Sequence, residues 1–296
     1  STLLAVAVVT GCGTKTGKVE NSGSLKSGSV TSTSKSASSD KATSSASSAG
    51  SNVSQASSNG TAEKVTFPIT MKHAYGETVI NAKPEKVVTL DWNNADAVLA
   101  LGIVPVGTAR ANWGPVTDKG LLPWTEAKFK ELGTENPNVF NDLEGYDYEA
   151  IAGTKPDIIV APYSGMDEKA YKRLSEIAPT LPFKETAWKT TWREQTVEAA
   201  EALGMKAEGE KLVADTDNFI KETLAKYPNL AGKSVAMCYI NAADLSNFSV
   251  YRTADPRGAY LTDLGFTFPE KIEAQAQDKN AFYVQISAEL AVESLS

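Results

Sequence analysis

Histidine and cysteine are scarce in this chain of 296 residues, and their scarcity excludes several kinds of site. His73 is the only histidine, so no zinc or manganese site can be built from several imidazoles. A histidine-assisted nucleophile would have to use His73 itself, and the chain has no Gly-x-Ser-x-Gly motif. The two cysteines, Cys12 and Cys238, cannot build a disulfide framework, and neither lies in a Cys-x-x-Cys motif. These absences argue against a hydrolase and against a resident metal.

His73 and Cys238 both have plain structural interpretations. His73 precedes the first predicted core strand, so we expect it at the surface or at a sheet edge and not as a heme ligand. Cys238 lies in an apolar strand and is expected to be a small core residue. Neither residue therefore points to chemistry.

Clusters of basic residues are missing as well. The formal net charge of the chain is −7. Residues 13–64 carry six Lys against three acidic residues, and residues 1–12 carry no charge, so residues 65–296 hold a net charge of −10. An acidic region without a Lys/Arg cluster argues against nucleic acid as a partner, because such binding needs a basic face that neutralises phosphates.

The first twelve residues combine a short apolar run with a cysteine. Leu3 to Val9 are seven consecutive apolar residues, which are too few to span a bilayer but match the core of a signal peptide. The following Val-Thr-Gly-Cys resembles the lipobox of bacterial lipoproteins, in which the cysteine receives lipid. We therefore predict that residues 1–12 are a signal-peptide remnant and that a lipid on Cys12 anchors the protein at the extracellular face of the cell membrane. The alternative is an apolar stretch that happens to precede a cysteine. Because Ser1 opens the chain without Met or a basic segment, we expect further residues before it.

Residues 13–64 have the composition of a tether. Residues 21–60 contain 17 Ser, and no aromatic residue occurs before Phe67. Such a segment cannot bury enough apolar surface to offset the entropy of ordering it, so the composition predicts a disordered spacer. A glycosylated, mucin-like stalk is the alternative, and it would also be a tether.

From Val65 the composition becomes that of a globular protein, and short apolar runs alternate with helical patterns. Asp157 to Ala161 is a nearly continuous apolar run, as expected for a strand covered on both faces. Alternation of this kind predicts an α/β layer with a mostly parallel sheet. In this part of the chain, strands are expected over 87–90, 104–107 and 157–161, and helices over 94–101, 147–154 and 167–178.

A long helix separates this series from a second, shorter one. Apolar residues recur at helical spacing over 207–227, about 30 Å of helix at roughly 1.5 Å per residue, and Pro228 follows. Because a helical pattern reaches Ser296 with no following strand, we expect the second lobe to be incomplete. After the long helix, strands are expected over 234–240, 248–252 and 282–286, and helices over 256–264 and from Ser287. The predicted divisions are a first lobe at 65–185, a helical connector at 186–231 and a second lobe at 232–296.

Four blocks of sequence resemble, in the same order, the iron-siderophore receptors of the periplasmic binding protein family, and especially its Gram-positive lipoproteins. The first block includes KPEKVVTLDWNNADAVLALGIVPVG, and the second begins YEAIAGTKPDIIVAPYSG. The resemblance covers 67–296, and the four blocks are 76–107, 148–180, 187–204 and 250–272. It implies two Rossmann-like α/β lobes joined by one long helix, with the ligand in a cleft between them. It further implies the solute-binding component of an ABC importer that captures ferric siderophores, delivers them to a permease and has no enzymatic activity.

A ferric siderophore supplies the ligands of its own iron, so its receptor needs no metal ligand and no cofactor. It needs aromatic walls and guanidinium donors that face the oxygens of the chelate. Ligands of open α/β sheets bind at the carboxyl ends of the strands, where Trp, Tyr and Arg residues of this chain are expected. Trp192 is placed in a loop before the connector, and Trp124 in a long loop where a role is least certain. The candidate ligand-binding residues are Trp92, Arg110, Trp113, Tyr163, Trp188, Arg252 and Arg257.

Each of these candidates has a structural alternative. Any one Trp can serve hydrophobic packing, and Arg252 or Arg257 can be a solvated surface charge or a member of a structural ion pair. Arg257 holds the Asp-Pro-Arg position of the fourth matching block, which favours it as a ligand contact.

Glu149 and Glu289 match family positions with another role. The resemblance implies that one exposed Glu on each lobe pairs with arginines of the permease during docking. The alternative is a carboxylate that merely suits the dipole at the beginning of a helix.

Two other functions stay open at this point. A receptor for cobalamin or heme would use the same fold, although the scarcity of His and Met disfavours heme. A tethered adhesion module would share the linker, but the long helix between two βα series favours a receptor. We expect a monomer. The sequence does not indicate which siderophore is bound.

Overall fold

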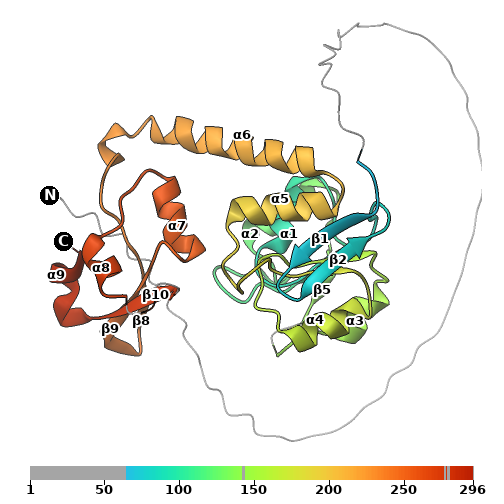
Figure 1. Ribbon diagram of the computed structural model, residues 1–296, viewed down its shortest axis with the longest axis horizontal. Helices are drawn as coiled ribbons and strands as arrows, with labels where there is room; N and C mark the ends of the chain where they lie inside the picture. The colour runs from blue at the N-terminus through green and yellow to red at the C-terminus, as the bar shows by residue number, and fades with distance from the viewer. Residues whose placement is uncertain (1–64, 142–143, 277, 279–280, 296) are drawn as a thin grey trace, which may run out of the picture. The chain divides into compact units, whose positions relative to one another are not determined.

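The computed structural model describes residues 65–141, 144–276, 278 and 281–295 (Figure 1). Cys12, the predicted signal-peptide remnant and the predicted tether lie outside the described residues. The α/β class is confirmed, with a parallel sheet flanked by helices. We call residues 65–205 the first lobe and residues 232–295 the second lobe.

A hairpin opens the first lobe. Strand β1 (Ile69–His73) pairs antiparallel with β2 (Gly76–Ile80), and Gly76 at the turn has φ 122°. His73 lies on an edge strand, as one of its two expected positions has it, but it is not at the surface, because it is only 7% exposed. Its Nε2 lies 3.0 Å from the hydroxyl of Thr78, and its Nδ1 accepts a hydrogen bond from the backbone N–H of Tyr75. These local polar partners allow a histidine to be buried in the hairpin, and burial lowers its pKa.

Five parallel strands form the central sheet of the first lobe, in the order β5-β4-β3-β6-β7. The strands predicted over 87–90 and 157–161 are confirmed. The strand predicted over 104–107 begins later, because Pro105 has no N–H and the first ladder bond runs from Val106 N to Val87 O. The strands are β3 (Val87–Thr89), β4 (Gly107–Ala109), β5 (Val139–Phe140), β6 (Ile158–Val160) and β7 (Thr180–Leu181).

Helices cover both faces of this sheet, as the apolar strands predict. Val87, Ile158 and Val160 pack on one face against α1 and α5. Val88 and Ile159 point to the other face, where α3 and α4 cover them. Both α3 and α4 begin at an Asp whose carboxylate accepts the N–H three residues on, and α2 packs against α1. The helices are α1 (Asn94–Ala100), α2 (Pro123–Glu131), α3 (Tyr148–Gly153), α4 (Glu168–Ser175) and α5 (Trp192–Ala202).

The long helix predicted over 207–227 is confirmed as α6 (Lys206–Leu224), which is followed by a 3-10 turn, η1 (Pro228–Leu230). It packs against α5, whose alanines face the core of the first lobe. Two tryptophans expected in loops lie in helices instead. Trp192 opens α5 behind a capping box of Thr191 and Glu194, and Trp124 lies in the first turn of α2, directly after Pro123.

The second lobe holds an antiparallel sheet, whose strand directions differ from those of a Rossmann-like sheet. Strand β9 lies in the middle and pairs antiparallel with both β8 and β10. A turn of two residues joins β8 to β9, and so short a connection permits only antiparallel pairing. The elements are β8 (Met237–Asn241), β9 (Asp244–Tyr251), α7 (Pro256–Asp263), α8 (Glu270–Ala274), β10 (Tyr283–Ser287), η2 (Ala288–Leu290) and α9 (Ala291–Leu295).

The core of the second lobe is small. Val250, Ile272 and Ile286 are its buried centre, and Cys238 packs against them as a small, partly buried residue, as predicted. Burial raises the pKa of the Cys238 thiol, which keeps it protonated. Large apolar side chains of the hairpin β8–β9 are exposed, among them Ile240 and Leu245.

Candidate functional site

The carboxyl ends of β3 and β6 define the candidate site. The chain runs from β3 to its neighbour β4 on one side and from β6 to its neighbour β7 on the other, so the strand order reverses between β3 and β6. Ligands of open α/β sheets bind at such a switch point. Buried Asn94 ties the two loops together: its amide donates to Leu90 O at 2.6 Å and Tyr163 O at 2.9 Å. Its Oδ1 accepts from Tyr163 N and from the side chain of Gln195.

A hollow of about 270 Å³ opens beside this point, at the ends of β3 and β4. It brings together three of the predicted ligand-binding residues, Trp92, Arg110 and Trp188. Aromatic and polar side chains from five separate segments share its wall, which fits a bulky ligand with a few oriented polar groups. The other principal lining residues are Asp91, Asn93, Asp96, Asn112, Leu121, Leu122, Thr125 and Tyr146.

The backbone of the β3–α1 loop is strained at two residues. Asp91 and Asn93 have φ of 59° and 60°, in the left-handed region that most residues avoid. The hydroxyl of Tyr146 donates to Asp91 Oδ2 at 2.6 Å, which helps to hold the carboxylate at the hollow. Strain of this kind persists where surrounding contacts impose it, and it is common at binding sites.

Asp96 is a partly buried carboxylate in the same wall. Its Oδ1 accepts the hydroxyl proton of Thr125 at 2.6 Å, and its Oδ2 accepts the indole N–H of Trp124 at 2.9 Å. Burial raises the pKa of Asp96, and the two hydrogen bonds, which stabilise the ionised form, offset this rise only in part. The Trp124 ring is thus held beside the hollow with 54% of its surface exposed.

Trp188 and Tyr163 form an aromatic pair. Their ring centroids are 5.3 Å apart at 77°, an edge-to-face contact. Gly165 permits this position of the indole, because a Cβ there would lie 2.3 Å from Trp188 Nε1. Burial raises the pKa of the Tyr163 phenol, so it stays protonated and able to donate. Trp113 lies on the same loop as Arg110 and is 60% exposed, but it does not line the hollow.

Arg252 has a structural role, so the prediction that it contacts a ligand is wrong. Its side chain is 3% exposed, and its Nε and Nη2 donate to the carboxylate of Glu273. Its Nη1 donates to the carbonyl oxygens of Asp278 and Ala281, at 2.8 and 2.9 Å. The guanidinium joins α8 to the chain before β10. The sequence pattern around Arg252 does not reveal this structural role.

Arg257 keeps an accessible guanidinium, with 47% of its side chain exposed. Its Nε and Nη2 donate to the two oxygens of buried Asp255, at 2.8 and 2.6 Å, and its Cζ lies 3.7 Å from the Tyr251 ring centroid. The ion pair and the ring orient this arginine at the beginning of α7.

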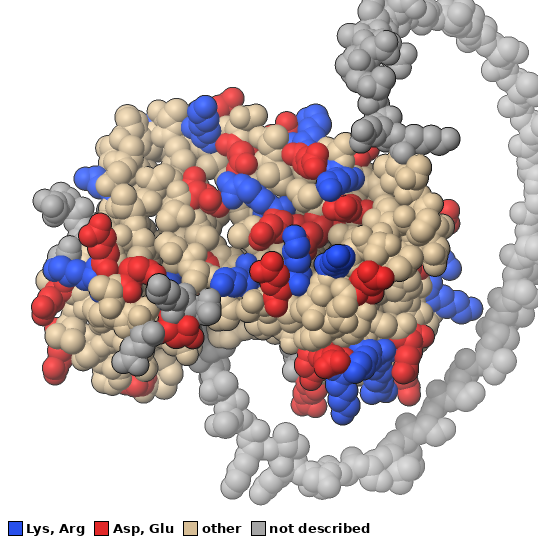
Figure 2. All heavy atoms as spheres, viewed as in Figure 1, with Lys and Arg blue, Asp and Glu red and all other residues tan. Residues whose placement is uncertain are grey.

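A second, shallower hollow of about 820 Å³ adjoins the first and shares Asp91, Tyr146 and Trp188 with it. Exposed Glu149, in the first turn of α3, lies in its lining. Glu289 is exposed in η2 of the second lobe. On the face that Figure 2 shows, Lys and Arg side chains are interspersed with Asp and Glu.

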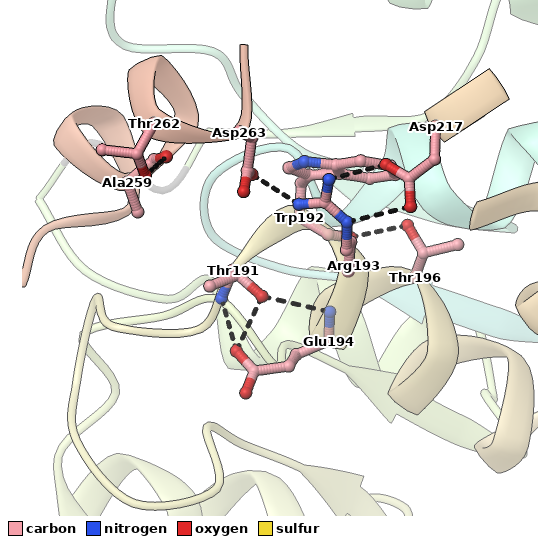
Figure 3. A network of polar contacts seen from close by, with 9 residues as sticks. All are labelled: Thr191, Trp192, Arg193, Glu194, Thr196, Asp217, Ala259, Thr262 and Asp263. Atoms are coloured by element: carbon pink, nitrogen blue, oxygen red, sulfur yellow. Dashed lines mark hydrogen bonds and ion pairs between the residues drawn. The ribbon is translucent and has the colours of Figure 1, made fainter. Parts of the chain in front are cut away.

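Arg193 joins three helices (Figure 3). From the first turn of α5 its Nε and Nη2 donate to Asp217 of α6, at 3.2 and 2.6 Å, and its Nη1 donates to Asp263 of α7. The two carboxylates raise the pKa of Arg193 against the effect of burial. Sequence reasoning missed this residue, because its partners are 24 and 70 positions away.

Sequence reasoning also missed Asp91, Asn94, Asp96 and Tyr146. A usable signal existed for the first two: the run Asp-Trp-Asn-Asn directly follows an apolar strand, where polar side chains meet ligands. Only Trp92 of that run was selected.

Among the described residues, no helix combines the length and apolarity needed to cross a bilayer. No group of three or more His, Cys, Asp or Glu side chains there is arranged to hold a metal ion.

Comparison with known sequences matches residues 87–294 to the family described as periplasmic binding protein. YfiY of Bacillus subtilis, a probable siderophore-binding lipoprotein, is 30% identical over 238 residues, which cover 77% of this chain and 66% of that protein. The Fe(3+)-citrate-binding protein YfmC of the same organism is 26% identical over 231 residues, 76% of this chain and 68% of that protein. The chain thus spans about two thirds of the length of these relatives.

Solved structures agree with this match. PiaA of Streptococcus pneumoniae in complex with ferrichrome has a TM-score of 0.70 and 46% identity, covering 75% of this chain and 74% of that one. SirA of Staphylococcus aureus with staphyloferrin B has a TM-score of 0.60 and 28% identity, covering 77% and 73%.

Proposed function

The chain belongs to the periplasmic binding protein family, and we propose that it is the solute-binding component of an ABC importer that captures ferric siderophores. The observation that carries the proposal is the hollow at the ends of β3 and β4, whose wall combines Trp92, Trp188 and Tyr146 with Arg110. Such a wall suits a large chelate that already saturates its iron. Relatives named for siderophores or ferric citrate, and neighbours solved with ferrichrome or staphyloferrin B, support this ligand class. In this role the protein binds and releases its ligand without catalysis and needs no metal or cofactor of its own.

Titration with ferric siderophores tests this function. Trp92 and Trp188 line the hollow, so a bound iron chelate should quench tryptophan fluorescence in a saturable way. Trp188→Ala removes the ring that contacts Tyr163 and should weaken binding by roughly tenfold, the range for an aromatic contact in a binding site. Trp113→Ala, on the neighbouring loop but outside the hollow, is the matched control. A protein that binds none of a panel of hydroxamate, catecholate and carboxylate chelates does not have this function.

Membrane anchoring through Cys12 is part of the proposal. The family relatives that are named lipoproteins support it, as does the Val-Thr-Gly-Cys motif. Cys12→Ala should move the protein from the membrane fraction to the medium, since lipid chains supply most of the membrane affinity. Unchanged fractionation of this variant contradicts the anchor.

Docking to the permease is assigned to Glu149 and Glu289, which are exposed on different lobes. The double variant Glu149→Ala/Glu289→Ala should bind its ferric siderophore in solution and fail to support uptake by cells, because each lost charge pair costs about 2–5 kcal/mol at an interface. Uptake at the wild-type rate removes both residues from this role. The same samples should elute as monomers in size-exclusion chromatography with light scattering.

A further inference from the structure

Arg193 lies at the beginning of α5, between two residues that tie this helix to the candidate site. Before it, the hydroxyl of buried Thr190 donates to Pro162 O at 2.6 Å, in the loop after β6. After it, the side-chain amide of buried Gln195 donates to Asn94 Oδ1 at 2.9 Å, at the end of the β3–α1 loop. The beginning of α5, and Arg193 with it, is therefore fixed relative to both loops.

Two carboxylates flank the guanidinium of Arg193, as Figure 3 shows. Its Nε and Nη2 donate to the two oxygens of Asp217 on α6, a bidentate contact that fixes the plane of the group. Its Cζ also lies 4.5 Å from the ring centroid of Trp192. In this orientation Nη1 donates to the carboxylate of Asp263 on α7. An arginine of the first lobe thus contacts the second lobe directly.

Asp263 and Arg257 lie at opposite ends of α7. A helix of this length, about 12 Å at roughly 1.5 Å per residue, moves as one unit, so a contact at its last residue also constrains its first turn. Arg257 presents its accessible guanidinium from that first turn. Burial raises the pKa of the Tyr163 phenol and the charge of Arg257 opposes this rise, so the two side chains lie within electrostatic range of each other. Both ends of α7 therefore interact with the first lobe.

We propose that Arg193 is a positioning residue for ligand binding: its ion pair with Asp263 holds α7 so that Arg257 faces the ligand site of the first lobe. The inference rests on the proposed function and adds a residue that lines neither hollow. A ligand that contacts both lobes binds more tightly when Arg257 is already in place, because less ordering is then required on binding. The side chains of Arg193 and Asp263 are 32% and 30% exposed, so solvent weakens the pair and the expected effect on affinity is only a few-fold.

The test measures dissociation constants of the complete protein with two probes, ferrichrome and ferric citrate, and follows the one that binds more tightly. Asp263→Asn removes the contact with α7 and keeps the pair of Arg193 with Asp217, so it should weaken binding about threefold to fivefold. Asp263→Glu restores a carboxylate and should recover most of this loss. Asp215→Asn is the matched control, because it removes a carboxylate whose exposed partner, Lys211, lies within the same helix, and it should leave the affinity unchanged.

A double-mutant cycle separates positioning from a general loss of structure. Arg257→Gln removes the guanidinium but keeps an amide that can donate to Asp255. In this background Asp263→Asn should change the affinity less than about 1.5-fold, because no guanidinium is left to position. A loss of threefold or more that persists in this background overturns the inference, and so does wild-type affinity of Asp263→Asn or an equal loss in Asp215→Asn; the proposed function stands in each case. Binding of neither probe overturns the proposed function and the inference with it.

Discussion

The two lobes differ in how their polar and apolar residues are used. The first lobe buries a five-stranded parallel sheet between two helical layers, and its site residues stand on loops held by buried side chains such as Asn94. The second lobe has a three-stranded antiparallel sheet, three fully buried apolar residues at its centre and exposed Ile240 and Leu245. The polar contacts of Arg252 replace much of the apolar packing that the second lobe lacks. The first lobe is therefore held by apolar burial, and the second relies on the contacts of a buried arginine.

Replacing Arg252 tests this contrast most strongly. Arg252→Ala leaves two carbonyl groups and Glu273 without their donor, and each carbonyl left buried and unsatisfied costs about 1–3 kcal/mol. Hydrogen exchange should then rise across α8 and β10 and stay slow in β3 and β6. Lys172→Ala, whose ion pair with Glu168 is exposed at both ends, is the control and should cost about 0–1 kcal/mol. Slow exchange in α8 of the Arg252 variant contradicts the role of the ion pair.

A matched pair of core substitutions is the second test. Ile158 of the first lobe and Ile272 of the second are both fully buried. Ile158→Ala should lower the free energy of unfolding by about 4 kcal/mol and Ile272→Ala by about 2 kcal/mol, since a small core collapses more readily around a cavity. Urea unfolding monitored for each lobe measures both values. Equal losses show that the cores are equally tight.

The stability of the first lobe should depend on pH through Glu198. Its Oε2 is buried without a hydrogen-bond partner, and burial raises the pKa of Glu198 from 4.5 to about 7. A carboxyl with a raised pKa is destabilising when ionised, so its cost appears as pH rises from 4.5 through 7. Glu198→Gln should therefore stabilise the protein by about 1–2 kcal/mol at pH 8 and by almost nothing at pH 4.5. Thermal unfolding of both proteins across this range measures the difference, and a gain that does not vary with pH disagrees with ionisation as the cause.

The smallest expected effect concerns Arg193, which contacts Asp217 and Asp263 (Figure 3). About a third of its side chain is exposed, so solvent weakens each pair. A double-mutant cycle of Arg193→Met and Asp263→Asn should give a coupling of about 0.5–1 kcal/mol that falls as salt is added. A coupling of zero means that α5 and α7 do not stabilise each other through this pair.

Local patterns of sequence predicted most elements but not their partners. Strands β3 and β6 and helices α1, α6 and α7 were predicted because hydrophobic period, caps and stop residues are local. The delayed start of β4 and the direction of β9 depend on pairing across the sheet. The burial of His73 on its edge strand was not predicted for a similar reason, since its hydrogen-bond partners, and not its type, make burial tolerable.

The candidate site divides in the same way. Residues after strands, such as Trp92, Arg110 and Trp188, were predicted because strand ends meet ligands in this class of sheet. Arg252 and Arg257 are five positions apart and could not be distinguished from the sequence. Only their surroundings in the fold show that Arg252 is buried in structural contacts and that Arg257 has an accessible guanidinium.

The sequence by itself determined the α/β class, the long helix, the family and the exclusion of a multi-histidine metal site, because composition, periodicity and motifs are properties of the chain alone. Only the tertiary structure decided which residues share the hollow. The β3–α1 segment with Asp91 and Asp96 is distant in sequence from Arg110 and from Tyr146, and folding places all of them in one wall. Desolvation and hydrogen-bond geometry at the site depend on which distant residues become neighbours.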